Sequence, residues 1–173
     1  MTENERNHTC CFTGHRDMGN FSKLRLGHDI EVAVRKCLDL DIYRFLCGGA
    51  RGFDAIAAAH VHRLQRTNPK IELHLILPCR DMTRGWKTED VRLHYAILGV
   101  ANSVTYLNDT YYDGCMRERN VYMIEHSTAC ICYYNEKNSR SGTGQTVRLA
   151  QKKGLLLTNV LPPPKKDEDT GDK

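Results

Sequence analysis

The residues whose types and spacing predict chemistry form a glycine-rich turn at positions 48–52, Gly-Gly-Ala-Arg-Gly. An apolar run ending at Cys47 precedes this turn, and apolar residues at helical spacing follow it. Backbone N–H groups at the start of a helix lack helical partners and lie at the positive end of the helix dipole, so they suit an anion such as phosphate. Because glycine lets a ligand approach the backbone closely, we expect an anionic ligand to contact Gly48, Gly49, Arg51 and Gly52.

The same turn would also serve as a tight strand-to-helix connection without a ligand. Its spacing departs from the dinucleotide fingerprint G-x-G-x-x-G, and it lacks the Lys-Ser/Thr pair that ends a P-loop. The turn alone therefore predicts neither an NAD enzyme nor an ATP enzyme.

Two further turns resemble the first. A glycine turn at residues 14–16 follows the first apolar run, and small residues at 141–144 open a later helix with backbone amides and hydroxyls. Loops at the carboxyl ends of parallel strands gather at one edge of a doubly wound sheet, where these turns would meet. The alternative for the charged side chains is a solvated loop. The expected ligand contacts are Gly14, His15, Arg16, Ser141, Gly142, Thr143 and Gly144.

The only tryptophan, Trp86, lies in a loop among the cations Arg80, Arg84, Lys87 and Arg92. An aromatic ring among cations is typical of sites that stack a base and hold phosphates. The alternative is a tryptophan that anchors the loop to the core.

Strand-like apolar runs alternate with helical periodicities along the chain, which predicts a Rossmann-like α/β fold with a doubly wound, mostly parallel sheet. We expect one domain over residues 1–161 and a disordered polar tail at 162–173, where prolines precede mixed charges. The expected strands are 9–13, 45–47, 71–77, 103–107, 128–134 and 155–161, and the expected helices include 22–38, 53–64 and 116–125.

Composition narrows the function classes. With 173 residues, a net charge of +4 and a pI near 8.6, the chain lacks the dense positive charge of a dedicated duplex-DNA binder. No apolar run approaches the roughly 18 residues of a membrane span, and the polar N-terminus lacks the apolar core of a signal peptide. We expect a soluble cytoplasmic protein without a membrane partner.

The chain has eight cysteines, and most of them lie in apolar strand-like runs, as do Cys10, Cys11 and Cys47. Such thiols are expected to be reduced and buried. Cys130 and Cys132 would share one face of a strand, which is the only cysteine spacing that suggests a metal, and we expect none.

Five motifs in this order resemble the SLOG superfamily, most closely its YpsA-like branch, over about residues 9–161. They are FTGHR at 12–16, CGGARGFD at 47–54, the set Pro78, Trp86 and Tyr95, the pair Arg119-Asn120 with Met123, and SGTGQT at 141–146. The resemblance implies a Rossmann-like sheet whose glycine turns bind a nucleotide-derived ligand, such as an ADP-ribose, NAD-type or nucleoside monophosphate ligand. It also implies a homodimer and polar contacts from Arg119 and Asn120.

The LONELY GUY branch of the superfamily suggests an enzyme, a nucleoside-monophosphate phosphoribohydrolase. Those enzymes use an arginine, which Arg119 matches in Met-x-x-Arg, and a glutamate after the second glycine turn, where this chain has Gln145. An amide cannot take up a proton as a carboxylate can. If there is catalysis, Arg119 and Asp54 are the expected catalytic residues, and Glu118 is the alternative carboxylate at another position.

The ARGFD segment at 50–54 also resembles the ARGID segment of the DNA processing protein A family, which leaves single-stranded DNA binding or protein interaction open. We expect binding or sensing of the nucleotide-derived ligand more than rapid turnover, with no obligatory cofactor. Gly49→Val is expected to abolish ligand binding and leave the fold intact.

Overall fold

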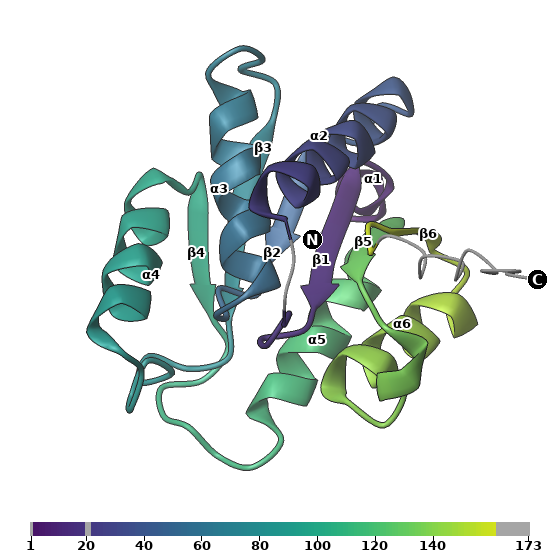
Figure 1. The fold of residues 1–173 in the computed structure, drawn as a ribbon. Coiled ribbons are helices and arrows are strands. Elements are labelled where there is room, and N and C mark those ends of the chain that lie inside the picture. The colour runs from purple at the N-terminus through teal and green to yellow at the C-terminus, as the bar shows by residue number, and fades with distance from the viewer. Residues whose placement is uncertain (1, 20–21, 162–173) are drawn as a thin grey trace, which may run out of the picture.

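The computed structural model describes residues 2–19 and 22–161, so the predicted tail at 162–173 lies outside the described residues. Its strands form one six-stranded, all-parallel sheet flanked by helices (Figure 1), which confirms the predicted Rossmann-like α/β fold. The strands are β1 (Thr9–Gly14), β2 (Arg44–Cys47), β3 (Glu72–Leu77), β4 (Ser103–Tyr106), β5 (Ala129–Tyr133) and β6 (Leu156–Asn159). The helices are α1 (Glu3–Asn7), α2 (Lys23–Asp39), α3 (Phe53–Gln65), α4 (Thr88–Val100), α5 (Cys115–Glu125) and α6 (Gly142–Lys152), with a 3-10 turn, η1, at Glu136–Asn138.

The strand order β4-β3-β2-β1-β5-β6 places the chain reversal between β1 and β5. The first four strands are added outward from β1 in one direction, and the chain then returns from β4 to pair β5 with the other edge of β1. The loops after β1 and β5 therefore leave the sheet in opposite directions. In open α/β sheets such a switch point leaves a crevice beyond the carboxyl ends of the strands.

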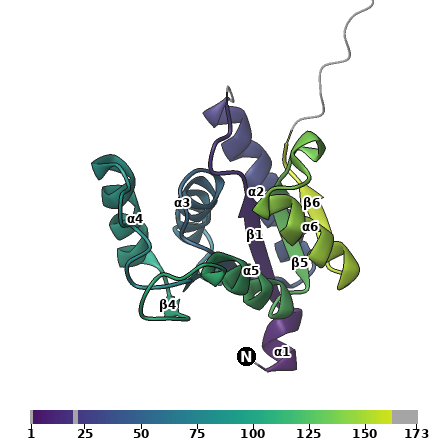
Figure 2. The same cartoon turned by 90° about the horizontal axis from the view of Figure 1, so that it is seen from below.

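Helices cover both faces of the sheet. Helices α2, α3 and α4 contact one another in sequence on one face, and α5 and α6 lie together on the other (Figure 2). Strand residues alternate between the two buried clusters, so Cys10 and Phe12 pack under α2 and α3, whereas Cys11 packs toward α5 and α6.

An aromatic stack fixes the start of α3 above the sheet. The rings of Phe12 and Phe53 lie 6.2 Å apart, and those of Phe53 and Tyr133 lie 5.9 Å apart. A Cβ atom at Gly14 would overlap the Phe53 side chain. Glycine at position 14 therefore lets α3 begin directly beside the end of β1.

Helix α1 was not predicted from the sequence, although its signal is there. Thr2 caps the helix, and its backbone N–H donates to Glu5 Oε2 at 2.7 Å, so Thr2 and Glu5 form a capping box. Glu5 also accepts from Arg44 Nη1 at 2.9 Å.

All eight cysteines are buried and none forms a disulfide, as predicted for reduced thiols. Within residues 2–19 and 22–161, no group of three or more histidine, cysteine or acidic side chains is placed to hold a metal ion. No helix in the described part of the chain is both long enough and apolar enough to cross a membrane.

Candidate functional site

Two cavities lie at the carboxyl edge of the sheet and share three lining residues. The smaller has a volume of about 300 Å³ and the larger about 810 Å³. The residues common to both are Arg16, Ala50 and Asp54. The first glycine turn thus lies on the boundary between two hollows instead of at the bottom of one.

The smaller cavity occupies the switch point. It is enclosed by the loop after β1, the first glycine turn, α5 and the start of α6. Its lining includes most of the predicted ligand contacts and Met116, which was not predicted. The lining residues are Phe12, Thr13, Gly14, His15, Arg16, Ala50, Asp54, Met116, Arg119, Asn120, Ser141, Gly142 and Thr143.

The N-terminus of α6 supplies the backbone donors of this cavity. Ser141 caps the helix, and its Oγ accepts from the Gly144 N–H at 3.1 Å. Among the described residues, the N–H groups of Gly142 and Thr143 have no hydrogen-bond acceptor. Asn120 steadies this end of the helix by donating to Thr146 Oγ1 at 2.9 Å. Two unpaired donors at the positive end of a helix dipole suit an anion.

Arg119 and Asp54 form a buried charge pair at the side of the smaller cavity. The closest approach, Arg119 Nη1 to Asp54 Oδ2, is 3.8 Å, and Arg119 Nη1 also donates to the Gly48 carbonyl. The Ala50 N–H donates to Asp54 Oδ2 at 3.4 Å. Arg119 Nε is buried and has no partner within the described residues. The pair therefore ties α5 to the first glycine turn and leaves the Arg119 Nε donor unused.

Burial dominates the ionisation of this pair. It raises the pKa of Asp54, which the nearby positive charge of Arg119 opposes. Burial likewise lowers the pKa of Arg119, against the attraction of Asp54. A guanidinium stays protonated in proteins, so Asp54 is the member of the pair that can take up a proton.

Two glycines of the predicted site, Gly48 and Gly144, lie against neighbouring elements: Gly48 against the Arg119 side chain and Gly144 against the backbone of Ser139. A Cβ at Gly48 would overlap the Arg119 guanidinium, and one at Gly144 would lie 2.8 Å from the Ser139 carbonyl carbon. Neither glycine lines a cavity. They allow close approach between elements.

The position of Gly49 bears on the expected effect of Gly49→Val. It has φ +65°, and a Cβ there would lie 2.5 Å from Leu77 Cδ2 in the core. Gly49→Val would therefore strain the backbone and disturb the core, so the expectation that it leaves the fold intact was wrong.

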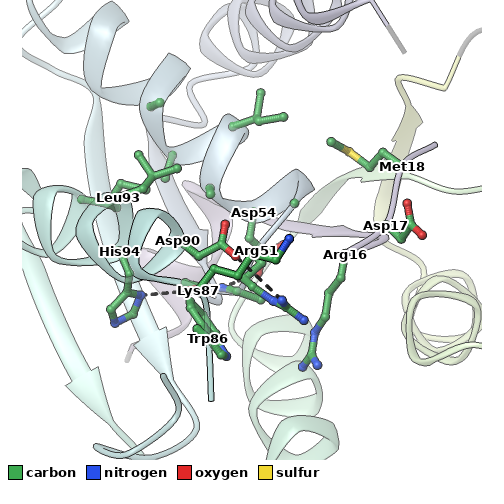
Figure 3. Close-up of a pocket in the computed structure, with 18 of the residues that line it drawn as sticks. Arg16, Asp17, Met18, Arg51, Asp54, Trp86, Lys87, Asp90, Leu93 and His94 are labelled. Carbon is green, nitrogen blue, oxygen red and sulfur yellow. Dashed lines mark hydrogen bonds and ion pairs between the residues drawn. The ribbon is translucent and has the colours of Figure 1, made fainter. Parts of the chain in front are cut away.

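The larger cavity lies between α3 and α4, and charged side chains of both signs, among them Arg16, Arg51, Lys87, Asp17 and Asp90, line it (Figure 3). Arg51 Nη1 lies 3.8 Å from Asp90 Oδ2, and the Arg51 guanidinium lies 5.8 Å from the centre of the Trp86 ring. His94 Nδ1 lies 3.1 Å from the Gly49 carbonyl oxygen, and its ring meets Trp86 edge-on at 5.5 Å. Trp86 therefore packs against the core and lines the cavity.

The structure divides the predicted site residues between the two cavities. The smaller cavity is lined by Gly14, His15, Arg119, Asn120, Ser141, Gly142 and Thr143. The larger cavity is lined by Gly49, Arg51, Gly52 and Trp86. Both cavities are lined by Arg16 and Asp54.

The cations Arg80, Arg84 and Arg92 line neither cavity. Instead Arg80 binds Asp109 at 3.1 Å, away from both cavities.

Sequence reasoning missed the contribution of α4. Asp90, His94 and Ile97 all line the larger cavity, and their i, i+4, i+7 spacing marks one helix face. That spacing predicts a common face but not that the face borders a cavity beside α3.

Acidification is expected to destabilise the protein, because burial lowers the pKa of both His15 and His94. In the unfolded chain a histidine titrates near pH 6.5. Below that pH the unfolded state binds protons that the native state does not bind. The free energy of unfolding therefore falls as the pH falls, by up to about 1.4 kcal/mol per pH unit for each histidine. Urea unfolding between about pH 8 and pH 5 measures this slope. His94→Gln should flatten it, and an unchanged slope in that variant would contradict the assignment.

The family whose profile matches this chain is the one that its motifs resemble. The profile of the YspA SLOG family matches residues 10–156. An uncharacterized SPbeta prophage-derived protein, YoqJ, of Bacillus subtilis is 29% identical over 148 residues, covering 78% of this chain and 85% of that protein. A UPF0398 protein of Halalkalibacterium halodurans is 28% identical over 108 residues, covering 61% of this chain and 57% of its own length. A UPF0398 protein of Brevibacillus brevis is 24% identical over 135 residues, covering 72% and 70%.

Proposed function

The chain belongs to the YspA SLOG family, and on that premise we propose that it binds a nucleotide-derived, phosphate-bearing ligand in the smaller cavity. Family membership supports a nucleotide-related function. The observation that carries the proposal is the start of α6, where the N–H groups of Gly142 and Thr143 are unpaired at the edge of this cavity.

Side chains around the cavity fit the same ligand. Arg119 Nε is a buried donor without a partner among the described residues, and the exposed Arg16 side chain adds a second positive charge. His15 Nε2 accepts from the Asn135 N–H at 3.3 Å, so the neutral ring carries its proton on Nδ1. Apart from the Asp54 carboxylate, which Arg119 faces, the groups named here are donors or positive charges, which suit an oxyanion.

A binding protein fits these residues better than a fast hydrolase. Gln145 and Glu118 line neither cavity, and Asp54 is the only carboxylate among the described residues that line the smaller one. Asp54 is already engaged by Arg119 and by the Ala50 N–H.

A phosphoribohydrolase is the second candidate function, and Asp54 favours it. Burial raises its pKa above the ordinary value of a carboxyl group, and a raised pKa favours a carboxyl group that takes up a proton during a reaction. Mass spectrometry of AMP after incubation with the protein separates the candidates. Intact AMP supports binding or sensing, and free adenine supports the hydrolase.

Isothermal titration with AMP, comparing Gly142→Val with the wild type, tests the binding site. A Cβ at Gly142 meets no atom within 4 Å, so the substitution adds bulk at the start of α6 and its first carbon meets no clash. We expect AMP affinity to fall by at least about tenfold and the melting temperature to stay unchanged. Gly99→Val on α4 is the matched control, since Gly99 is also surrounded by open space and lines neither cavity. Equal AMP affinity in both variants, or no AMP binding by the wild type, would overturn the proposal.

A further inference from the structure

We propose that the larger cavity is a second subsite for the same ligand, and that this ligand consists of two organic groups joined through a diphosphate. This inference rests on the proposed function. It narrows the ligand class from any nucleotide to a dinucleotide-like molecule, one organic group of which lies between α3 and α4.

Continuity between the cavities is the first argument. Arg16, Ala50 and Asp54 line both hollows, and Arg16 is exposed between them. A phosphoryl group bound at the start of α6 would therefore have the Arg16 side chain at its outer side. A molecule extended beyond that phosphate would pass along Arg16, Ala50 and Asp54 to reach the larger cavity.

Positive charge at the boundary is the second argument. The Arg51 guanidinium is held between the Trp86 ring and Asp90, and its side chain remains 39% exposed. Arg16 and Arg51 both extend at the mouth of the larger cavity in Figure 3. Lys87 lines the same mouth. Arg16 at the boundary and Arg51 on the side of the larger cavity together match the charge of two linked phosphates better than that of one.

The lining of the larger cavity is the third argument. Its interior walls are mainly apolar, made by Ala55, Ile56 and Ala59 of α3 and by Leu93 and Ile97 of α4. Leu93 is 43% exposed there. Apolar walls behind a charged mouth suit a planar organic group attached to a charged linker.

Volume agrees with this division. The smaller cavity, about 300 Å³, lies at the lower end of the range of roughly 300–1,000 Å³ typical of small-molecule sites. The larger, about 810 Å³, lies near the upper end. A mononucleotide in the smaller cavity would leave most of the available space unused.

Isothermal titration with AMP, ADP, ADP-ribose and NAD tests the second subsite, with ligand integrity checked by mass spectrometry. We expect ADP-ribose or NAD to bind at least about tenfold more tightly than AMP. Ala59→Trp fills the larger cavity from an exposed position on α3 and should remove that gain while AMP affinity stays within about twofold. Ala59→Ser is the matched control and should keep the gain.

A second variant covers the case in which Ala59→Trp fails to fold. Arg51→Gln should lower the affinity for ADP-ribose and NAD by about tenfold and that for AMP by less than about threefold. Arg66→Gln, at an exposed arginine that lines neither cavity, should change none of them.

The results separate the two proposals. Equal affinities for AMP, ADP-ribose and NAD, or an equal loss of all three in Ala59→Trp and Arg51→Gln, would overturn the second subsite and leave the nucleotide site in place. Absence of binding by every ligand, AMP included, would overturn both.

Discussion

Replacing Arg119 with methionine is expected to lower the free energy of unfolding by roughly 3–5 kcal/mol. The substitution keeps an unbranched side chain of similar length, but it removes the charge that faces Asp54 at 3.8 Å and the donor to the Gly48 carbonyl. Asp54 would then be a buried carboxylate that keeps only backbone donors, among them the Ala50 N–H at 3.4 Å. Urea unfolding at pH 7 measures the loss.

The pH dependence of this loss identifies its cause. Burial already raises the pKa of Asp54 against the pull of Arg119, so removing Arg119 raises that pKa further. The native variant then binds a proton more readily than the unfolded chain, and its deficit should shrink as the pH falls. Asp54→Asn in the Arg119→Met background should recover part of the stability at pH 7.

Arg117→Met is the control for helix α5, because Arg117 is exposed on the same helix. It should change the free energy of unfolding by less than about 0.5 kcal/mol. A deficit in Arg119→Met that is constant from acid to neutral pH would contradict the charge-pair explanation.

Gly52→Ala is expected to lower the free energy of unfolding by about 2–4 kcal/mol and to weaken AMP binding. Gly52 has φ +77°, and a Cβ there would lie 2.7 Å from Arg16 Cα and overlap the Arg16 carbonyl oxygen. The loop after β1 is bonded to this turn, since the Phe53 N–H donates to the His15 carbonyl at 3.2 Å. Moving the turn would therefore displace Arg16 from both cavities.

Gly154→Ala separates backbone strain from the clash. Gly154 has a similar φ of +73° but nothing within 4 Å of its Cβ position. It should cost only the left-handed backbone strain, about 1–2 kcal/mol, and leave AMP affinity unchanged. Equal losses in the two variants, measured by urea unfolding, would show that the contact with Arg16 contributes nothing.

The strands and most helices were predictable because their signals are local. The apolar run ending at Cys47, the glycine turn and the apolar spacing that follows specify β2 and α3 within a few residues of the observed bounds. Ser22, predicted as a helix cap, caps α2. These signals depend on side-chain period and capping, which the sequence displays directly.

The division of the site into two cavities was not predictable in the same way. His94 gives no sign in the sequence that it contacts the Gly49 carbonyl 45 residues earlier, and Arg119 reaches Gly48 across 71 residues. Such contacts depend on where α4 and α5 settle on the sheet. Family resemblance identified Arg119 as a site residue, but only packing shows that its partner is Asp54.

The pairing of β1 with β5 has a consequence for synthesis on the ribosome. Strand β1 bonds to β2 on one edge, and its other edge has no partner until residues 129–133 emerge. The nascent chain thus carries an apolar strand with one open edge, a template for pairing with other chains, until β5 has been made. Since residues of α5 and α6 also line the smaller cavity, that cavity is complete only after β5 and α6 have been made. The cavity and the protection of the β1 edge therefore form at the same stage of synthesis.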